Sequence, residues 1–137
     1  MDKKLIRIID ANINRSREAL RVCEEIARFI LNNRKFSLRL KNIRHDITRA
    51  VKSMPIPYKV FLEERNSKCD VGSDMVVYHK RGINYTDILV SNMKRAQEAV
   101  RVLEEFSKVK SKSASARFQK IRFVLYQTEK NMLRDLL

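Results

Sequence analysis

The chain contains an internal repeat, which constrains its fold more than any other feature of the sequence. Residues 12–25 align with residues 92–105 at an offset of 80, and eight of the fourteen aligned positions are identical. The identical positions are Asn12/Asn92, Arg15/Arg95, Glu18/Glu98, Ala19/Ala99, Arg21/Arg101, Val22/Val102, Glu24/Glu104 and Glu25/Glu105. A weaker match follows, between "RLKNIR" at residues 39–44 and "RFQKIR" at residues 117–122, at an offset of 78. Two copies are too few for a solenoid, so the repeat predicts two equivalent halves of one domain.

The spacing of apolar residues predicts that each half is a pair of long helices joined by a short turn. We expect one domain, 1–137, with a first repeat at 3–54, a central loop at 55–85 and a second repeat at 86–137. The chain has only two glycines and two prolines, which favours long uninterrupted helices. The sequence therefore predicts an all-α fold, a four-helix bundle of two pseudo-symmetric helical hairpins with a long central loop.

The pattern also predicts where the helices begin and end. The first helix is expected at about 3–31 with Asp2 as its N-cap, and the second ends at Met54, before the prolines of "MPIP". The third is expected to begin near Thr86, as a cap, and to end at about Lys108, with "KSKSAS" as the following turn. In the central loop "YKVFLEER" predicts a short helix, and the remainder is expected to cover one end of the bundle as a lid.

The chain is strongly basic. Lys and Arg number 30 against 16 Asp and Glu, which gives a formal net charge of +14. Such a charge attracts nucleic acid, anionic membranes or phosphorylated small molecules, although part of it suits an ordinary lysine-rich surface. Because we find no signal peptide, no membrane span and no disulfide framework, we expect a reduced, cytoplasmic protein without membrane partners. Of the two cysteines, Cys23 is expected to be a small buried hydrophobic residue.

Each predicted long helix places one arginine within its apolar stripe, turned toward the interior of the bundle. These arginines are Arg15, Arg44, Arg95 and Arg122, and the first and third helices add Asn12, Glu18, Asn92 and Glu98 on or beside the same face. A buried guanidinium without an anion is costly, so these groups need partners. Either glutamates pair with them in a buried network, or bound phosphate completes the pairing. Ordinary solvated positions on the polar side are expected for Arg21, Glu24, Arg28 and Arg101.

The residue types available in the chain limit the reactions that it could catalyse. The chain has no glycine-rich phosphate loop, and its two histidines are His45, on the polar side of its helix, and His79, in the central loop. The polar groups available are therefore those of Arg, Asp, Glu and Asn. This set suits phosphoryl transfer, with Mg²⁺, to an acceptor that is already an anion. A phosphate oxygen is deprotonated at neutral pH, so such an acceptor needs no general base.

Four stretches resemble a known family: "IIDANINRSREALRVCEEIARF", "DVGSD", "VSNMKRAQEAVRVLEEFSKV" and "FQKIRFVLYQTEKNML". They resemble the small helical hydroxymethylpyrimidine phosphate kinases of thiamine biosynthesis, found alone or fused ahead of thiamine phosphate synthase. The resemblance covers nearly the whole chain and looks like the standalone form. It implies phosphorylation of 4-amino-5-hydroxymethyl-2-methylpyrimidine phosphate by ATP to the diphosphate, with little activity on the unphosphorylated alcohol. The matching motif residues are Asp10, Asn12, Arg15, Glu18, Arg44, Asp70, Gly72, Asn92, Arg95, Glu98 and Arg122.

Roles for these residues follow from the chemistry expected of each type. The catalytic set is expected to be Arg15, Arg95, Glu18 and Glu98. Phosphate and substrate binding is expected at Arg44, Arg122, Asn12, Asn92, Asp70 and Gly72. The candidate Mg²⁺ ligands are Glu18, Glu98 and Asp70. No role is assigned to His79 or Arg81, because "MVVYHKRG" fits the family pattern poorly.

Two other functions stay open on the sequence. One is a basic helical protein that binds nucleic acid, although inward arginines and an aromatic content of 7% argue against nucleic acid as the partner. The other is a structural bundle whose arginines pair internally and bind nothing. If the chain is the kinase, its partners are the phosphorylated pyrimidine and ATP, and an exposed helix face could make a homodimer.

Overall fold

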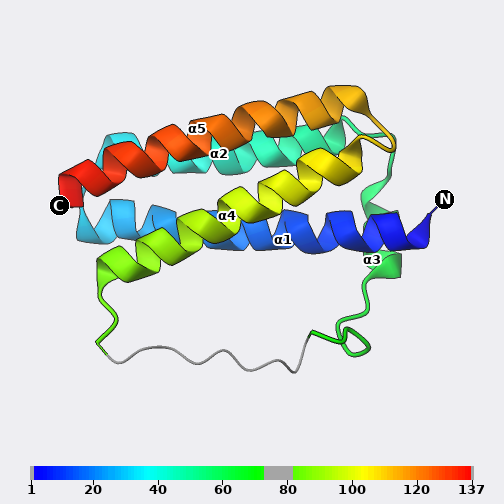
Figure 1. The fold of residues 1–137 in the computed structure, drawn as a ribbon, viewed down its shortest axis with the longest axis horizontal. Helices are drawn as coiled ribbons and strands as arrows, with labels where there is room; N and C mark the ends of the chain where they lie inside the picture. The colour runs from blue at the N-terminus through cyan, green and yellow to red at the C-terminus, as the bar shows by residue number, and fades with distance from the viewer. Residues whose placement is uncertain (1, 73–81, 137) are drawn as a thin grey trace.

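Helices account for all regular structure in the part of the chain that can be described. The structure is a computed structural model, and it describes residues 2–72 and 82–136. Within these ranges there is no strand, and the helices are α1 (Lys3–Glu25), α2 (Arg34–Lys52), α3 (Tyr58–Glu64), α4 (Tyr85–Ser107) and α5 (Lys112–Leu136). The predicted all-α fold is confirmed, as is the short helix in the central segment (Figure 1).

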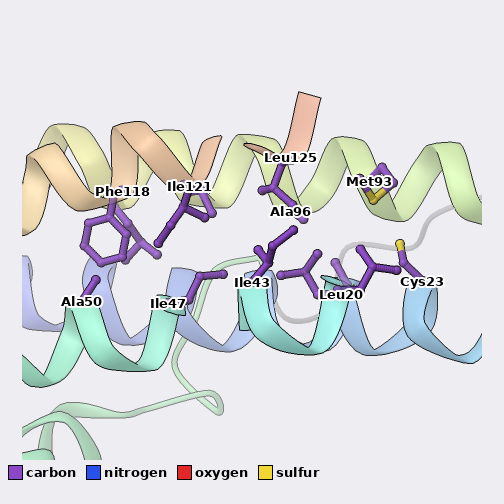
Figure 2. Close-up of a cluster of buried hydrophobic side chains, with 14 of the residues drawn as sticks. Leu20, Cys23, Ile43, Ile47, Ala50, Met93, Ala96, Phe118, Ile121 and Leu125 are labelled. Carbon is purple, nitrogen blue, oxygen red and sulfur yellow. The ribbon is translucent and has the colours of Figure 1, made fainter. Parts of the chain in front are cut away.

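The four long helices pack around one apolar core. Helix α1 contacts α4 and α2, while α5 contacts α4 and α2, so that each hairpin packs against the other. Figure 1 shows α4 crossing α1, with α5 and α2 running together on the other side of the bundle. All four long helices contribute to the cluster in Figure 2, which includes Leu20, Ile47, Met93 and Phe118, each almost completely buried. The three- and four-residue spacing of apolar side chains is what places one face of every helix in this core.

The helix ends show which capping predictions were right. The Asp2 carboxylate accepts hydrogen bonds from the backbone N–H groups of Lys4 and Leu5, at 3.0 and 3.3 Å, so its predicted role as N-cap is confirmed. The predicted cap at Thr86 is wrong, because α4 is capped by Asn84, whose side chain accepts from the backbone of Asp87 at 2.9 Å. The Asp87 carboxylate accepts in return from the Asn84 backbone at 3.1 Å, and this reciprocal pair places Thr86 inside the first turn.

Two other predicted boundaries differ from the structure by a few residues. Helix α2 ends at Lys52 rather than at Met54. Helix α5 already begins at Lys112, so the turn predicted from "KSKSAS" is shorter than expected. The backbone of Ser115 donates to Ser111 at 3.1 Å, and its hydroxyl donates to the Glu104 carbonyl at 2.7 Å. These hydrogen bonds stabilise the first turn of α5, so the helix begins within the serine- and lysine-rich stretch that was predicted to be a turn.

The first hairpin has a longer connection than the second. Helix α1 continues as a π-helix, Ile26–Ile30, closed by a hydrogen bond from Leu31 N–H to the Ile26 carbonyl at 2.9 Å. Asn32 then adopts a positive φ of 48°, a left-handed conformation that asparagine tolerates better than most residues. The wider π turn accommodates extra residues. The first connection is longer than the second, so equivalent residues of the two hairpins lie 80 apart before the connection and 78 apart after it.

Two ion pairs occupy equivalent places in the two hairpins. In the first, the Glu24 carboxylate accepts hydrogen bonds from Arg44 Nε at 2.8 Å and Nη2 at 3.3 Å. In the second, Arg122 Nη2 donates to both carboxylate oxygens of Glu104, at 3.2 and 3.3 Å. The hydroxyl of Tyr126 accepts from Arg122 Nη1 at 3.2 Å, and this bond together with Glu104 raises the pKa of Arg122 above its usual value.

These pairs correct two predictions. Arg44 and Arg122 do turn inward, with side chains only 13% and 10% exposed, but a glutamate neutralises each of them within its own hairpin. The prediction that Glu24 is solvated is wrong, because it is 7% exposed, and the guanidinium of Arg44 reaches it from the neighbouring helix. Arg44 and Arg122 therefore each have an anionic partner in the structure, one within each hairpin.

The central segment packs against the first helix. Helix α3 contacts α1, and its Phe61 side chain is 1% exposed. Figure 1 places α3 beside the half of α1 that is nearer the N-terminus. Residues 73–81 lie outside the described residues. They include His79, Arg81 and part of the segment that was predicted to cover one end of the bundle as a lid.

Removal of the Glu104 carboxylate tests the buried ion pair. We expect Glu104→Ala to lower the free energy of unfolding by about 3 kcal/mol, because it leaves the Arg122 guanidinium buried without an anion. The matched control is Glu105→Ala on the same helix, where the side chain is 41% exposed and the loss should be much smaller. The measurement is urea denaturation followed by far-UV circular dichroism. Equal losses in the two variants would contradict the assigned role.

The reactivity of the two cysteines tests the burial of Cys23 in the core. Cys23 is completely buried, as predicted, and burial raises the pKa of its thiol to about 12, whereas Cys69 is exposed. At pH 8 only about one Cys23 thiol in ten thousand is the reactive thiolate, so a thiol reagent should label one cysteine in the native chain and both in denaturant. A native Cys69→Ser variant should not react. Rapid labelling of that variant would show that Cys23 is accessible.

Candidate functional site

A groove between α1 and α4 is lined by equivalent residues from the two repeats. It encloses about 620 Å³. Its ten lining residues form five pairs related by the 80-residue offset: Asn12/Asn92, Arg15/Arg95, Glu18/Glu98, Ala19/Ala99 and Val22/Val102. The structure therefore brings together six of the predicted site residues, three from each helix, in one pseudo-symmetric cavity.

The local sequence explains the shape of this groove. Both α1 and α4 carry buried small residues at equivalent positions, and small residues allow the backbones of packed helices to come close. Ser16 and Ala96 are completely buried and equivalent in the repeat, and Ala19 and Ala99 are each 4% exposed at the floor of the groove. The longer polar side chains at the neighbouring positions then stand along the two sides.

The depth of the arginines was predicted incorrectly. Arg15, Arg95, Glu18 and Glu98 are exposed and line the open groove, rather than the interior of the bundle. A helical wheel gives the direction of a side chain around one axis, so it did not separate the buried centre of the apolar stripe from its rim. The predicted convergence of four arginines on one interior pocket is also wrong, since Arg44 and Arg122 are absent from this groove and pair with glutamates elsewhere.

The charged groups in the groove are not paired with one another. Within the described ranges, Arg15 and Arg95 form no ion pair or side-chain hydrogen bond, and the same holds for Glu18 and Glu98. The alternative in which these arginines and glutamates form a buried salt-bridge network is therefore not what the structure contains. The asparagines are held in the same way in both halves, because the side-chain N–H groups of Asn12 and Asn92 donate to the carbonyls of Ile8 and Ile88 at 2.8 and 2.9 Å.

A second cavity continues from the groove along the N-terminal half of α1. It encloses about 500 Å³ and shares Asn12 and Arg15 with the groove. Its other charged lining residues are Lys4, Arg7, Arg65, Asp10 and Asp70. The sequence analysis did not single out Lys4, Arg7 or Arg65, because exposed cations in so basic a chain give no signal of their own.

A bidentate ion pair builds one side of this second cavity. Arg65 Nη2 and Nε donate to the two carboxylate oxygens of Asp10 at 2.7 and 2.8 Å. Asp10 is 6% exposed on α1, and Arg65 follows the last residue of α3, so the pair ties the central segment to the first helix. The hydrogen bond to Asp10 also raises the pKa of Arg65 above its usual value.

Asp70 and Gly72 do not line the groove itself. Asp70 lies in the second cavity, and its Oδ1 accepts a hydrogen bond from the Gly72 backbone at 2.9 Å. A Cβ atom added to Gly72 would lie 3.4 Å from Asp70 Oδ1, which is an ordinary contact. The described backbone therefore shows no reason why position 72 should require glycine, in contrast to Gly82 with its φ of 75°.

Three carboxylates lie where they could contact a metal ion bound in the groove or in the adjoining cavity. Among the described residues, no group of three or more His, Cys, Asp and Glu side chains is arranged to hold a metal ion. Glu18 and Glu98 nevertheless line one groove, with Asp70 in the adjoining cavity. Mg²⁺ is commonly bound by one or two carboxylates together with substrate phosphates and water, so the donor set fits a Mg²⁺ ion that arrives with a phosphorylated ligand.

Comparisons with known proteins agree on a family. Residues 7–131 match the ThiD2 family. A thiamine-phosphate synthase of Prochlorococcus marinus subsp. pastoris is 35% identical over 132 residues, which are 96% of this chain and 36% of the relative. The thiamine-phosphate synthase of Synechocystis sp. is 33% identical over 132 residues, 94% of this chain and 36% of the relative. That of Rhodopirellula baltica is 33% identical over 129 residues, 92% of this chain and 33% of the relative.

The chain spans about a third of the length of these curated relatives. No solved structure matches it significantly. Across residues 2–72 and 82–136, no helix has the length and apolar character that a membrane crossing needs. The family match extends over most of the chain and includes both halves of the groove, so the chain belongs to the ThiD2 family.

Proposed function

We propose that the chain acts in thiamine biosynthesis and phosphorylates 4-amino-5-hydroxymethyl-2-methylpyrimidine phosphate with ATP, giving the diphosphate and ADP. The curated relatives support a role in this pathway, because they are named thiamine-phosphate synthases. Their name describes proteins about three times as long as the matched region, so it does not decide which reaction this region performs. The chemistry of the groove favours phosphoryl transfer.

One observation carries this proposal: Arg15 and Arg95 share a groove and have no anionic partner among the described residues. Two guanidiniums held on facing helices favour an anion between them, and the planar fork of arginine binds phosphate oxygens in a bidentate manner. The volume of about 620 Å³ lies in the range of small-molecule sites. A ligand without phosphate would leave both guanidiniums without a partner, which is why we expect poor turnover of the unphosphorylated alcohol.

The proposed reaction needs positioning and charge neutralisation more than acid–base chemistry. An oxygen of the acceptor phosphate attacks the γ-phosphorus of ATP, a new P–O bond forms, and the bond to the β-phosphate oxygen breaks as ADP leaves. The attacking oxygen is already deprotonated at neutral pH, so no general base is needed. Arg15 and Arg95 would hold the two phosphates in line and neutralise charge on the transferred group, while Asn12 and Asn92 orient them.

The carboxylates have a complementary role in this proposal. Glu18 and Glu98 would hold the Mg²⁺ that accompanies ATP, and the metal, when bound, neutralises phosphate charge. Their place beside the arginines also limits where an anion binds, because phosphate oxygens are repelled by a carboxylate that holds no cation. Asp70, in the adjoining cavity, is a further candidate ligand of this metal.

Substitution of the groove arginines tests the proposal. We expect Arg15→Ala and Arg95→Ala each to lower kcat/KM by about 100- to 1000-fold, because each removes a preorganised cation from the transferred phosphate. Both side chains are exposed and form no ion pair with a described residue, so far-UV circular dichroism should not change. Arg117→Ala, an exposed arginine on α5, is the matched control and should keep full activity. Near-wild-type rates in the groove variants would refute the assignment.

The net charge of +14 keeps nucleic-acid binding as the alternative function. A thermal-shift comparison of ATP with Mg²⁺, the pyrimidine phosphate and a DNA oligomer separates the two. Stabilisation by the two small molecules that is lost in Arg95→Ala supports the kinase. Stabilisation by DNA alone, falling steeply with salt, supports the alternative. Formation of thiamine phosphate by the isolated chain would instead assign it the reaction for which its relatives are named.

A further inference from the structure

The groove alone does not distinguish the two ends of a ligand. Each side contributes one asparagine, one arginine and one glutamate from equivalent positions. A reaction between two different phosphorylated molecules nevertheless needs one end for the donor and another for the acceptor. The distinction must therefore come from residues outside the symmetric part of the groove.

The pseudo-symmetry breaks at the first turns of the two helices. At the 80-residue offset, Lys4 and Arg7 of α1 correspond to Asn84 and Asp87 of α4. Asn84 and Asp87 bond to each other across the helix start, at 2.9 and 3.1 Å, and so are committed to capping α4. On α1 the cap is supplied by Asp2, which leaves the side chains of Lys4 and Arg7 available.

The side chains of Lys4 and Arg7 line a cavity that continues from the groove. Both residues are exposed, and within the described ranges neither side chain forms an ion pair. They share the cavity with Arg15, which also lines the groove, whereas the fourth cation, Arg65, is neutralised by Asp10. Among the residues that the structure describes, and even with the carboxylate of Asp70 present, the α1 side of the site carries more positive charge than its capped counterpart on α4.

We propose that the triphosphate of the donor nucleotide lies on the α1 side, across Arg15, Arg7 and Lys4, and that the acceptor phosphate lies on the Arg95 side. This assignment rests on the proposed kinase function and adds the orientation of the two substrates. A nucleoside triphosphate is longer and more highly charged than a phosphate monoester, so it matches the end where cations extend beyond the groove. The transferred phosphate would then lie between Arg15 and Arg95.

The test removes the two extra cations and measures binding without requiring turnover. In Lys4→Gln/Arg7→Gln, calorimetric titration at fixed ionic strength should show the Kd of inorganic tripolyphosphate rising by about tenfold or more, because two charge-assisted contacts are lost. The Kd of the pyrimidine phosphate should change by less than about twofold. In turnover assays the KM for ATP should rise while the KM for the pyrimidine phosphate stays the same.

A control with the same loss of charge excludes a long-range effect. Lys3→Gln/Lys120→Gln removes two exposed lysines, neither of which lines the groove or the adjoining cavity, and should leave the Kd of tripolyphosphate nearly unchanged. An unchanged Kd in Lys4→Gln/Arg7→Gln, or a weakening confined to the pyrimidine phosphate, would overturn the orientation. If wild-type protein has no kinase activity but the tripolyphosphate effect appears, the anion subsite stands and the proposed reaction fails.

Discussion

The close packing of α1 against α4 is the contact on which both the core and the candidate site depend. It joins the two hairpins, and both helices carry buried small residues at equivalent positions, Ser16 with Ala96 and Ala19 with Ala99. Figure 1 shows that α4 crosses α1. Side chains of both helices line an open groove between them. One packing arrangement therefore buries the apolar stripe and exposes matched polar residues along its rim.

Desolvation explains why the four arginines have two different environments. Arg44 and Arg122 are largely removed from water, where an uncompensated charge is costly, and each has a buried glutamate as a fixed partner. Arg15 and Arg95 remain in water at the rim of the groove, where an unpaired guanidinium costs little. The same solvation leaves these two groups able to exchange water for the oxygens of an incoming anion.

Features that depend on adjacent residues could be predicted from the sequence, whereas features that require a neighbouring helix could not. The α1 cap at Asp2 follows from adjacent residues and was predicted, and the burial of Cys23 follows from its place in the apolar stripe. The cap of α4 was wrongly predicted at Thr86, because the reciprocal bonds between Asn84 and Asp87 start the helix one residue earlier. The burial of Glu24 was missed because its partner lies on another helix, 20 residues further along the chain.

The sequence by itself determined the all-α class, the two equivalent hairpins and the polar residues that recur in them, since periodicity and self-similarity are properties of the chain alone. Only the tertiary structure decided that Arg15 and Arg95 face an open groove, that Glu24 and Glu104 neutralise the other two arginines, and that Lys4 and Arg7 extend one end of the site. The physical reason is that a residue's position around its own helix sets only its direction. Its burial and its partners depend on where the neighbouring helices cross and how closely they approach.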